Sequence, residues 1–121
     1  MAGERRLEYF LLEYVRDIVR GQGLNIAVVL LDPTDMDTGF CRLRCVSNWE
    51  SKVLAMDPDA DIAVLSSLIR EIEERLSSQR SRAEMLQVLE SSFSNAVCIS
   101  PRYKYQSENP IRDLEQLASR F

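Results

Sequence analysis

The sequence predicts an α+β fold: a small, mainly antiparallel sheet of about four strands, with three helices packed on one face. Three apolar or alternating segments lie within the first 46 residues and are separated by short turns. Strands joined by short turns pair antiparallel, and the amphipathic helical patterns that come later can then cover the sheet together. The 121 residues contain no linker, repeat or low-complexity tract, so a single domain over residues 1–121 is predicted.

The first two segments differ in how clearly they predict a structure. In residues 7–18 the apolar side chains recur at offsets of three and four, which favours a helix, whereas the Tyr, Phe and Val content favours a strand. Residues 24–31 are rich in branched apolar residues and predict a buried strand, with Asn25 placed to bond either the nearby backbone or a ligand. The GQG stretch at residues 21–23 comes directly before a strand. Phosphate-binding loops come after a strand and before a helix, so GQG is interpreted as a turn.

The third segment, residues 40–46, alternates in polarity and predicts a half-buried strand. One face carries Cys41, Leu43 and Cys45. The other face carries Arg42 and Arg44, which could together hold a carboxylate or phosphate, or could pair with surface glutamates. Trp49 follows this strand. An exposed Trp there would be a contact anchor, and a covered one would cap the sheet edge.

Two helices are predicted in the middle of the chain. Asp57 is a good N-cap and Pro58 suits the first helical position, which predicts a helix over residues 57–77. Ser81 and Glu84 match a capping box, which predicts the start of a second helix. The charged outer face of the first helix is interpreted as a solvated surface.

The last part of the chain predicts a strand, a loop and a helix. Residues 95–100 are apolar and indicate a strand, and residues 101–108 are interpreted as a polar loop. In that loop Arg102 and Tyr103 begin an RYKY stretch, whose alternating cations and rings are typical of a segment that contacts nucleotides. An Asn-Pro pair opens residues 109–121 and predicts a terminal helix.

The composition limits the classes of function. The chain has no histidine, which removes the commonest general base, the Ser-His-Asp and Cys-His pairs and the HExxH zinc site. A net charge of −4 argues against binding nucleic acid through its phosphates. Three cysteines without histidine are a poor zinc ligand set, so reduced thiols are predicted. No catalytic residue, metal or cofactor is therefore predicted, and a non-enzymatic role is favoured.

The expected cellular location follows from two features that the sequence does not show, a membrane-spanning segment and a signal peptide. No apolar run approaches the roughly 20 residues that a membrane-spanning helix needs. The first ten residues, MAGERRLEYF, do not show the apolar segment and small-residue cleavage site of a signal peptide. A cytoplasmic protein without a membrane segment is expected.

Several motifs resemble a bacterial family known as domain of unknown function 3037. They are RGQ at residues 20–22, NIAVVL at 25–30, AMDPDAD at 55–61 and SP at 100–101. Members of the family commonly have Pro near the position of Arg16. Proline fits a strand end better than a helix interior, so the resemblance favours a strand over residues 6–15.

Two positions depart from the family pattern. Gln22 stands where members usually have Glu, and Ala27 where they usually have Gly. A Glu that acted as a base or metal ligand would be lost here, whereas Gln could still cap a turn. The resemblance implies no established activity. Because members are often encoded beside HipA-like, kinase-fold proteins, it implies a role as the partner or regulator of such a protein.

Three functions are consistent with these observations. The first is a non-enzymatic cytoplasmic module that binds a protein partner. The second is a small nucleotide- or nucleic-acid-acting enzyme, which requires Arg42, Arg44, Arg102 and nearby tyrosines to converge in one cleft. The third is a homodimer closed by an uncovered sheet face or edge. The candidate binding residues are Gln22, Asn25, Arg42, Arg44, Trp49, Arg102 and Tyr103.

Overall fold

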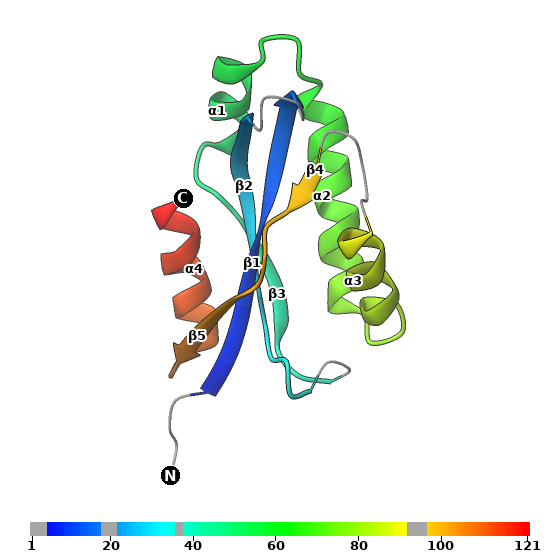
Figure 1. The fold of residues 1–121 in the computed structure, drawn as a ribbon, viewed down its shortest axis with the longest axis vertical. Coiled ribbons are helices and arrows are strands. Elements are labelled where there is room, and N and C mark those ends of the chain that lie inside the picture. The colour runs from blue at the N-terminus through cyan, green and yellow to red at the C-terminus, as the bar shows by residue number, and fades with distance from the viewer. Residues whose placement is uncertain (1–4, 18–21, 36–37, 92–96) are drawn as a thin grey trace.

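The computed structural model describes residues 5–17, 22–35, 38–91 and 97–121, and of residues 16, 17 and 22 only the backbone. These residues form five strands and four helices (Figure 1). The strands are β1 (Arg5–Asp17), β2 (Gln22–Leu31), β3 (Cys41–Cys45), β4 (Val97–Ile99) and β5 (Tyr103–Ser107). The helices are α1 (Trp49–Met56), α2 (Ile62–Ser77), α3 (Arg82–Glu90) and α4 (Pro110–Arg120).

The five strands form one antiparallel sheet centred on β1. The order is β3-β2-β1-β4, and β5 pairs with β1 as well. β4 pairs with residues 12–14 of β1 and β5 with residues 5–9, so both lie along the side of β1 that β2 does not occupy. The predicted α+β class is confirmed. The described residues form five strands and four helices, where about four and three were expected.

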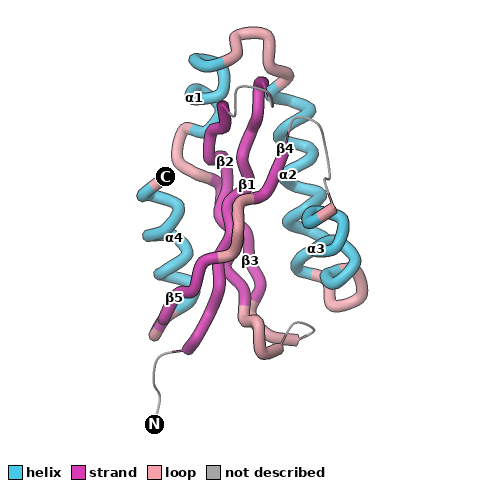
Figure 2. Tube along the Cα trace, in the orientation of Figure 1, coloured by secondary structure: helices cyan, strands magenta, loops and turns pink. Residues whose placement is uncertain are grey.

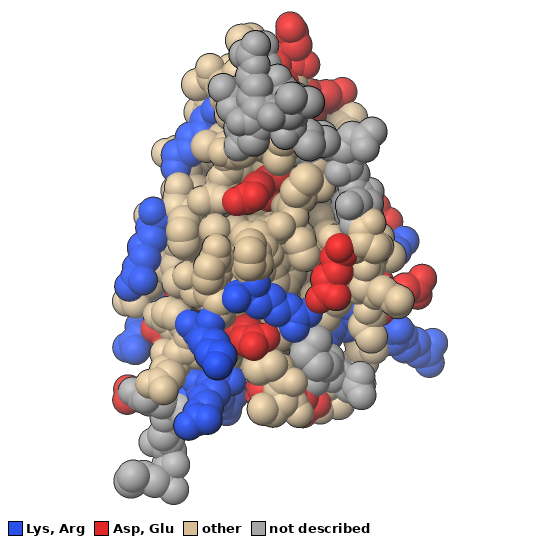
Figure 3. Space-filling model, viewed as in Figure 1, with Lys and Arg blue, Asp and Glu red and all other residues tan. Residues whose placement is uncertain are grey.

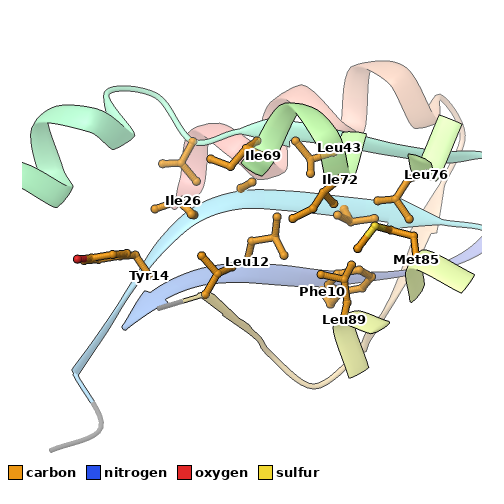
Figure 4. Packing of buried hydrophobic residues seen from close by; sticks show 14 of the residues in the cluster. Phe10, Leu12, Tyr14, Ile26, Leu43, Ile69, Ile72, Leu76, Met85 and Leu89 are labelled. Atoms are coloured by element: carbon orange, nitrogen blue, oxygen red, sulfur yellow. The ribbon is translucent and has the colours of Figure 1, made fainter. Parts of the chain in front are cut away.

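Helices cover both faces of the sheet (Figure 2). On one face α1, α2 and α3 pack over the larger core cluster, to which Phe10, Leu43, Ile72 and Leu89 contribute (Figure 4). On the other face α4 packs against Leu7, Leu11, Val28 and Leu30. Whereas the sequence predicts all helices on one face, α4 lies on the opposite one. β1 and β2 are apolar on both faces, so each face needs a cover to keep its side chains from water.

Helix α1 has no counterpart in the sequence-based prediction. Trp49 and Val53 are buried in the larger core cluster and anchor this helix next to β2. The remaining residues of α1 are mostly exposed, and the helix has only eight residues. A segment this short has too few periodic apolar positions to stand out in the sequence, so its packing against the sheet determines that it forms.

The start of α2 also differs from its prediction. Asp57 ends α1, and its Oδ2 accepts a hydrogen bond from the hydroxyl of Tyr14 at 2.6 Å. Asp61 is the N-cap of α2, and its Oδ1 accepts a hydrogen bond from the Val64 N–H at 3.1 Å. The stretch DPDAD offers three Asp residues as caps. Asp57, the first of them, accepts the long-range hydrogen bond from Tyr14, and α2 begins after Asp61, the last of them.

Other local predictions are confirmed. The strand over residues 6–15 lies within β1, and β3 alternates between buried and exposed residues as expected. The N-cap of α4 is Asn109, whose Oδ1 accepts a hydrogen bond from the Arg112 N–H. Helix α3 begins where the capping box predicts, but the Ser81 hydroxyl does not cap it and instead donates to the Arg75 carbonyl.

The loop predicted over residues 101–108 is wrong for most of its length, because residues 103–107 form β5. This segment is polar and short, and its sequence gives little reason for an extended backbone. Pairing with β1 explains the extended backbone of this segment, since Tyr103 lies opposite Tyr9 and Tyr105 opposite Leu7. Strand formation here depends on packing against β1.

Candidate functional site: the open sheet edge at β5

The sequence-predicted arginines lie at opposite edges of the sheet. Arg42 and Arg44 are exposed on β3, and Arg44 lies 3.7 Å from Glu115 of α4. Arg102 and Tyr103 lie at the start of β5, beyond both β2 and β1. The structure therefore places Arg102 and Tyr103 at one edge of the sheet and the two β3 arginines at the other.

Of the other predicted binding residues, Trp49 is buried and Asn25 is half-buried. Trp49 is 6% exposed and belongs to the core. Asn25 lies within β2 opposite Glu13, beside an irregularity of the β1–β2 register. The backbone of Gln22 begins β2, and its side chain lies outside the described part of the structure.

The backbone of β5 is open on the side away from β1. The Ser100 N–H donates to the Leu11 carbonyl at 2.9 Å, so odd-numbered residues of β1 direct their backbone groups towards β4 and β5. Along the β1–β5 register these residues face Tyr103, Tyr105 and Ser107. The N–H and C=O groups of Lys104 and Gln106 consequently point away from the sheet. Both residues are exposed, and among the described strands β5 pairs with β1 alone.

One face of this edge carries a cluster of four aromatic rings, here named the edge cluster. The ring centroid of Tyr9 lies 5.3 Å from that of Tyr103, 6.1 Å from that of Tyr105 and 6.4 Å from that of Phe121. Tyr103 is 44% exposed, and the other three are half-buried. Aromatic side chains provide a large contact area at low entropic cost, so the edge cluster adds a contact surface beside the open backbone groups.

The opposite face of the edge is charged. The Arg102 guanidinium lies 3.5 Å from the carboxylate of Glu8 and 2.7 Å from that of Glu90 on α3. Lys104 lies opposite Glu8 in the register. In Figure 3, basic side chains gather over β5 and the start of β1, with acidic ones among them. The edge thus combines open backbone groups, aromatic rings and mixed charges.

The second edge of the sheet, at β3, is closed. The Val46 N–H donates to the Ile26 carbonyl, so even-numbered residues of this segment bond to β2, and the backbone groups of Cys41 and Leu43 point outward. Yet Cys41 and Leu43 are only 4% and 6% exposed, and Cys45, whose backbone groups also point outward, is half-buried. Helices α2 and α4 flank this strand, and side chains from both line a shallow groove beside it, namely Glu73, Ser77, Ile111, Leu114 and Glu115.

Burial suppresses the reactivity of two of the three thiols, Cys41 and Cys45. All three cysteines are free, as predicted. Burial raises the pKa of the Cys41 thiol, against the lowering influence of Arg82 and Arg102, and burial also raises the pKa of the Cys45 thiol. Both thiols therefore stay protonated at neutral pH and are poor nucleophiles.

The residues that the structure describes contain neither a metal-binding cluster nor a membrane-spanning helix. Within these residues, no group of three His, Cys, Asp or Glu side chains is arranged to hold a metal ion. No helix in the same part of the chain is long and apolar enough to cross a membrane.

Sequence reasoning found part of this site and missed the rest. It singled out Arg102 and Tyr103 for their charge and ring, but not the backbone of Lys104 and Gln106. The available signal was the alternation in YKYQS, bounded by Pro101 and by the Asn-Pro pair that follows. Whether such a strand lies at an edge or in the centre of a sheet depends on the tertiary structure.

The fold and its two edges define an α+β domain with one closed and one open sheet edge. A family model described as "Protein of unknown function (DUF3037)" matches residues 9–121, so the chain belongs to this family. The family resemblance of the sequence motifs is thereby confirmed. Comparisons with curated proteins and with solved structures gave no significant match.

Proposed function

We propose that the protein is a non-enzymatic interaction module that binds another polypeptide as an added strand along β5. The observation that carries this proposal is the pair of exposed residues, Lys104 and Gln106, whose backbone groups point away from the sheet. An extended polypeptide that binds a sheet edge gains main-chain hydrogen bonds there, and nearby side chains provide specificity. The edge cluster beside β5 supplies such side chains.

The enzymatic alternative has less support. It requires Arg42, Arg44 and Arg102 to converge on one ligand, together with a carboxylate suited to proton transfer. The first two residues lie on β3 and the third lies beside β5, at the other edge of the sheet. We therefore do not propose a nucleotide- or nucleic-acid-acting enzyme.

The family resemblance suggests one partner to look for. If the proposed module acts as a partner or regulator of a HipA-like, kinase-fold protein, that protein should be captured from a lysate of the native host. Nuclease treatment of the lysate should not release it, because the proposed contact is between polypeptides.

The backbone of Lys104 provides a direct test. The Lys104 N–H points outward, so Lys104→Pro removes one donor of the open edge and leaves the ladder to β1 intact. The matched control, Lys104→Ala, removes the same side chain and keeps the donor. Tagged chains are used to capture proteins from the host lysate, and also a co-expressed copy that carries a different tag.

We expect a stoichiometric partner with the wild-type chain and with Lys104→Ala, and its loss with Lys104→Pro. Circular dichroism and thermal unfolding check that both variants fold. A partner that Lys104→Pro captures equally well would show that binding occurs elsewhere. The absence of any partner in both capture experiments would refute the proposed function.

A further inference from the structure

We propose that the strand added to β5 is β5 of a second copy of this chain, paired antiparallel about a two-fold axis at Tyr105. This inference rests on the proposed function, because it names the partner of the same edge. It follows from three features of the segment from Arg102 to Glu108: the direction of its backbone groups, the order of its side chains and the space outside the edge.

The backbone groups fit the two-fold register. With Tyr105 opposite Tyr105 of the second copy, Lys104 lies opposite Gln106 and Gln106 opposite Lys104. Lys104 and Gln106 are the two residues of β5 whose N–H and C=O groups point outward. Residues that face each other in this way exchange two hydrogen bonds in an antiparallel ladder. The register therefore uses every outward backbone group of β5, on both copies.

The side chains fit the same register. Arg102 and Glu108 flank β5 at its two ends and lie opposite each other across the axis, so each end of the contact joins a cation to a carboxylate. Lys104 meets the neutral Gln106. At the centre, the two Tyr105 side chains lie together on the face that carries the edge cluster.

Neighbouring two-fold registers fit less well. With the axis at Lys104, the two ammonium groups would lie directly opposite each other, which is destabilising. With the axis at Gln106, the pairing would be shorter, and Arg102 would have no Glu opposite it. A Lys on an edge strand disfavours indiscriminate strand pairing. Here it also selects the register centred on Tyr105.

Space is available for the second copy. In Figure 1, β5 lies at the front of the molecule, and no described helix or strand lies in front of it. The two strands would join two five-stranded sheets into one continuous sheet. A two-fold contact of this kind is closed, because each copy uses its open edge once and its other edge, at β3, is covered by helices.

Cysteine cross-linking tests the register. In the proposed dimer the two Tyr105 residues form a non-hydrogen-bonded pair, with Cα atoms about 4.5 Å apart, within the range of a disulfide. The matched control is Tyr103→Cys on the same strand and face. Tyr103 lies opposite Ser107 of the second copy, which places the two Tyr103 residues about 13 Å apart. Cys45→Ser and Cys98→Ser in both variants remove the half-buried native thiols.

Under mild oxidation we expect a disulfide-linked dimer for Tyr105→Cys and essentially none for Tyr103→Cys. Equal cross-linking of both variants, or none of Tyr105→Cys, would overturn the two-fold register. If Tyr105→Cys fails and a host protein is still lost with Lys104→Pro, the partner is a different chain, and the proposed function stands.

A second measurement does not depend on the fold tolerating a Tyr105 substitution. Glu108 is exposed, and Glu108→Arg places two cations opposite each other at both ends of the contact. Sedimentation velocity over a concentration series should show a reversible dimer for the wild-type chain and about tenfold weaker dimerisation for Glu108→Arg. The exposed control Glu74→Arg on α2 should leave dimerisation unchanged. A wild-type monomer at all concentrations, or a Glu108→Arg chain that dimerises as well as wild type, would overturn the inference.

Discussion

The two edges of the sheet have the same backbone chemistry and different surroundings. Each edge strand has five residues and directs N–H and C=O groups away from the sheet. At β3 these groups belong to residues that helices α2 and α4 cover, such as Leu43, which is 6% exposed. At β5 they belong to the exposed residues Lys104 and Gln106.

This difference indicates which edge is available for binding. An uncovered edge strand can pair with any extended chain, so natural sheets usually cover such edges or place charged residues on them. This protein covers one edge with two helices and leaves the other with a single Lys, aromatic rings and balanced charges. The open edge is therefore the better candidate for a selective contact.

The largest difference in stability is expected when one residue of each edge is replaced by Ala in the isolated chain. Leu43→Ala removes buried side-chain volume between the sheet and α2 and should lower the free energy of unfolding by about 3 kcal/mol. Tyr103→Ala, at a position that is 44% exposed, should lower it by less than about 1 kcal/mol. Urea denaturation at a concentration where the chain is monomeric measures both values. Similar costs for the two variants would mean that the edges are equally well packed.

A smaller effect is expected where β4 meets β5. The Leu11 N–H donates to the Ser100 hydroxyl at 2.8 Å, and this bond is buried. Ser100→Ala leaves that N–H without its acceptor and should lower the free energy of unfolding by about 2 kcal/mol. The control Ser119→Ala removes an exposed hydroxyl that donates to the Gln116 carbonyl, and it should change stability very little.

Hydrogen exchange can localise this effect. Ser100→Ala should speed the exchange of the amides of β5 more than that of the β3 amides, because Ser100 connects the two strands of the open edge. Equal acceleration at both edges would show that the sheet opens as one unit.

The smallest effect is expected for the charges that flank the closed edge. Arg44 and Glu115 are 3.7 Å apart, and their side chains are 57% and 58% exposed. Exposed ion pairs contribute little to stability, so Arg44→Gln should change the free energy of unfolding by less than about 0.5 kcal/mol. Denaturation in low and high salt tests this value. A loss above 1 kcal/mol would mean that charge, rather than packing, keeps the β3 edge closed.

The sequence by itself determined the elements whose pattern is set locally or repeats along the chain. Branched apolar runs predicted β2, alternation predicted β3, and the Asn109 cap with Pro110 predicted the start of α4. For residues 6–15 the family resemblance favoured a strand over a helix, and β1 confirms it. The lack of histidine and the net negative charge disfavour several chemistries whatever the fold.

Only the tertiary structure decided the features that depend on residues far apart in the chain. Asp57 bonds to Tyr14, so the helix that it was expected to begin starts instead after Asp61. The polar segment after Ser100 becomes a strand because β1 offers it a partner, and α4 crosses to the second face because β1 and β2 are apolar on both. Whether a sheet edge is open likewise does not depend on the residues of the edge strand alone. It depends on which helices lie beside the strand, and that is set by packing across the whole domain.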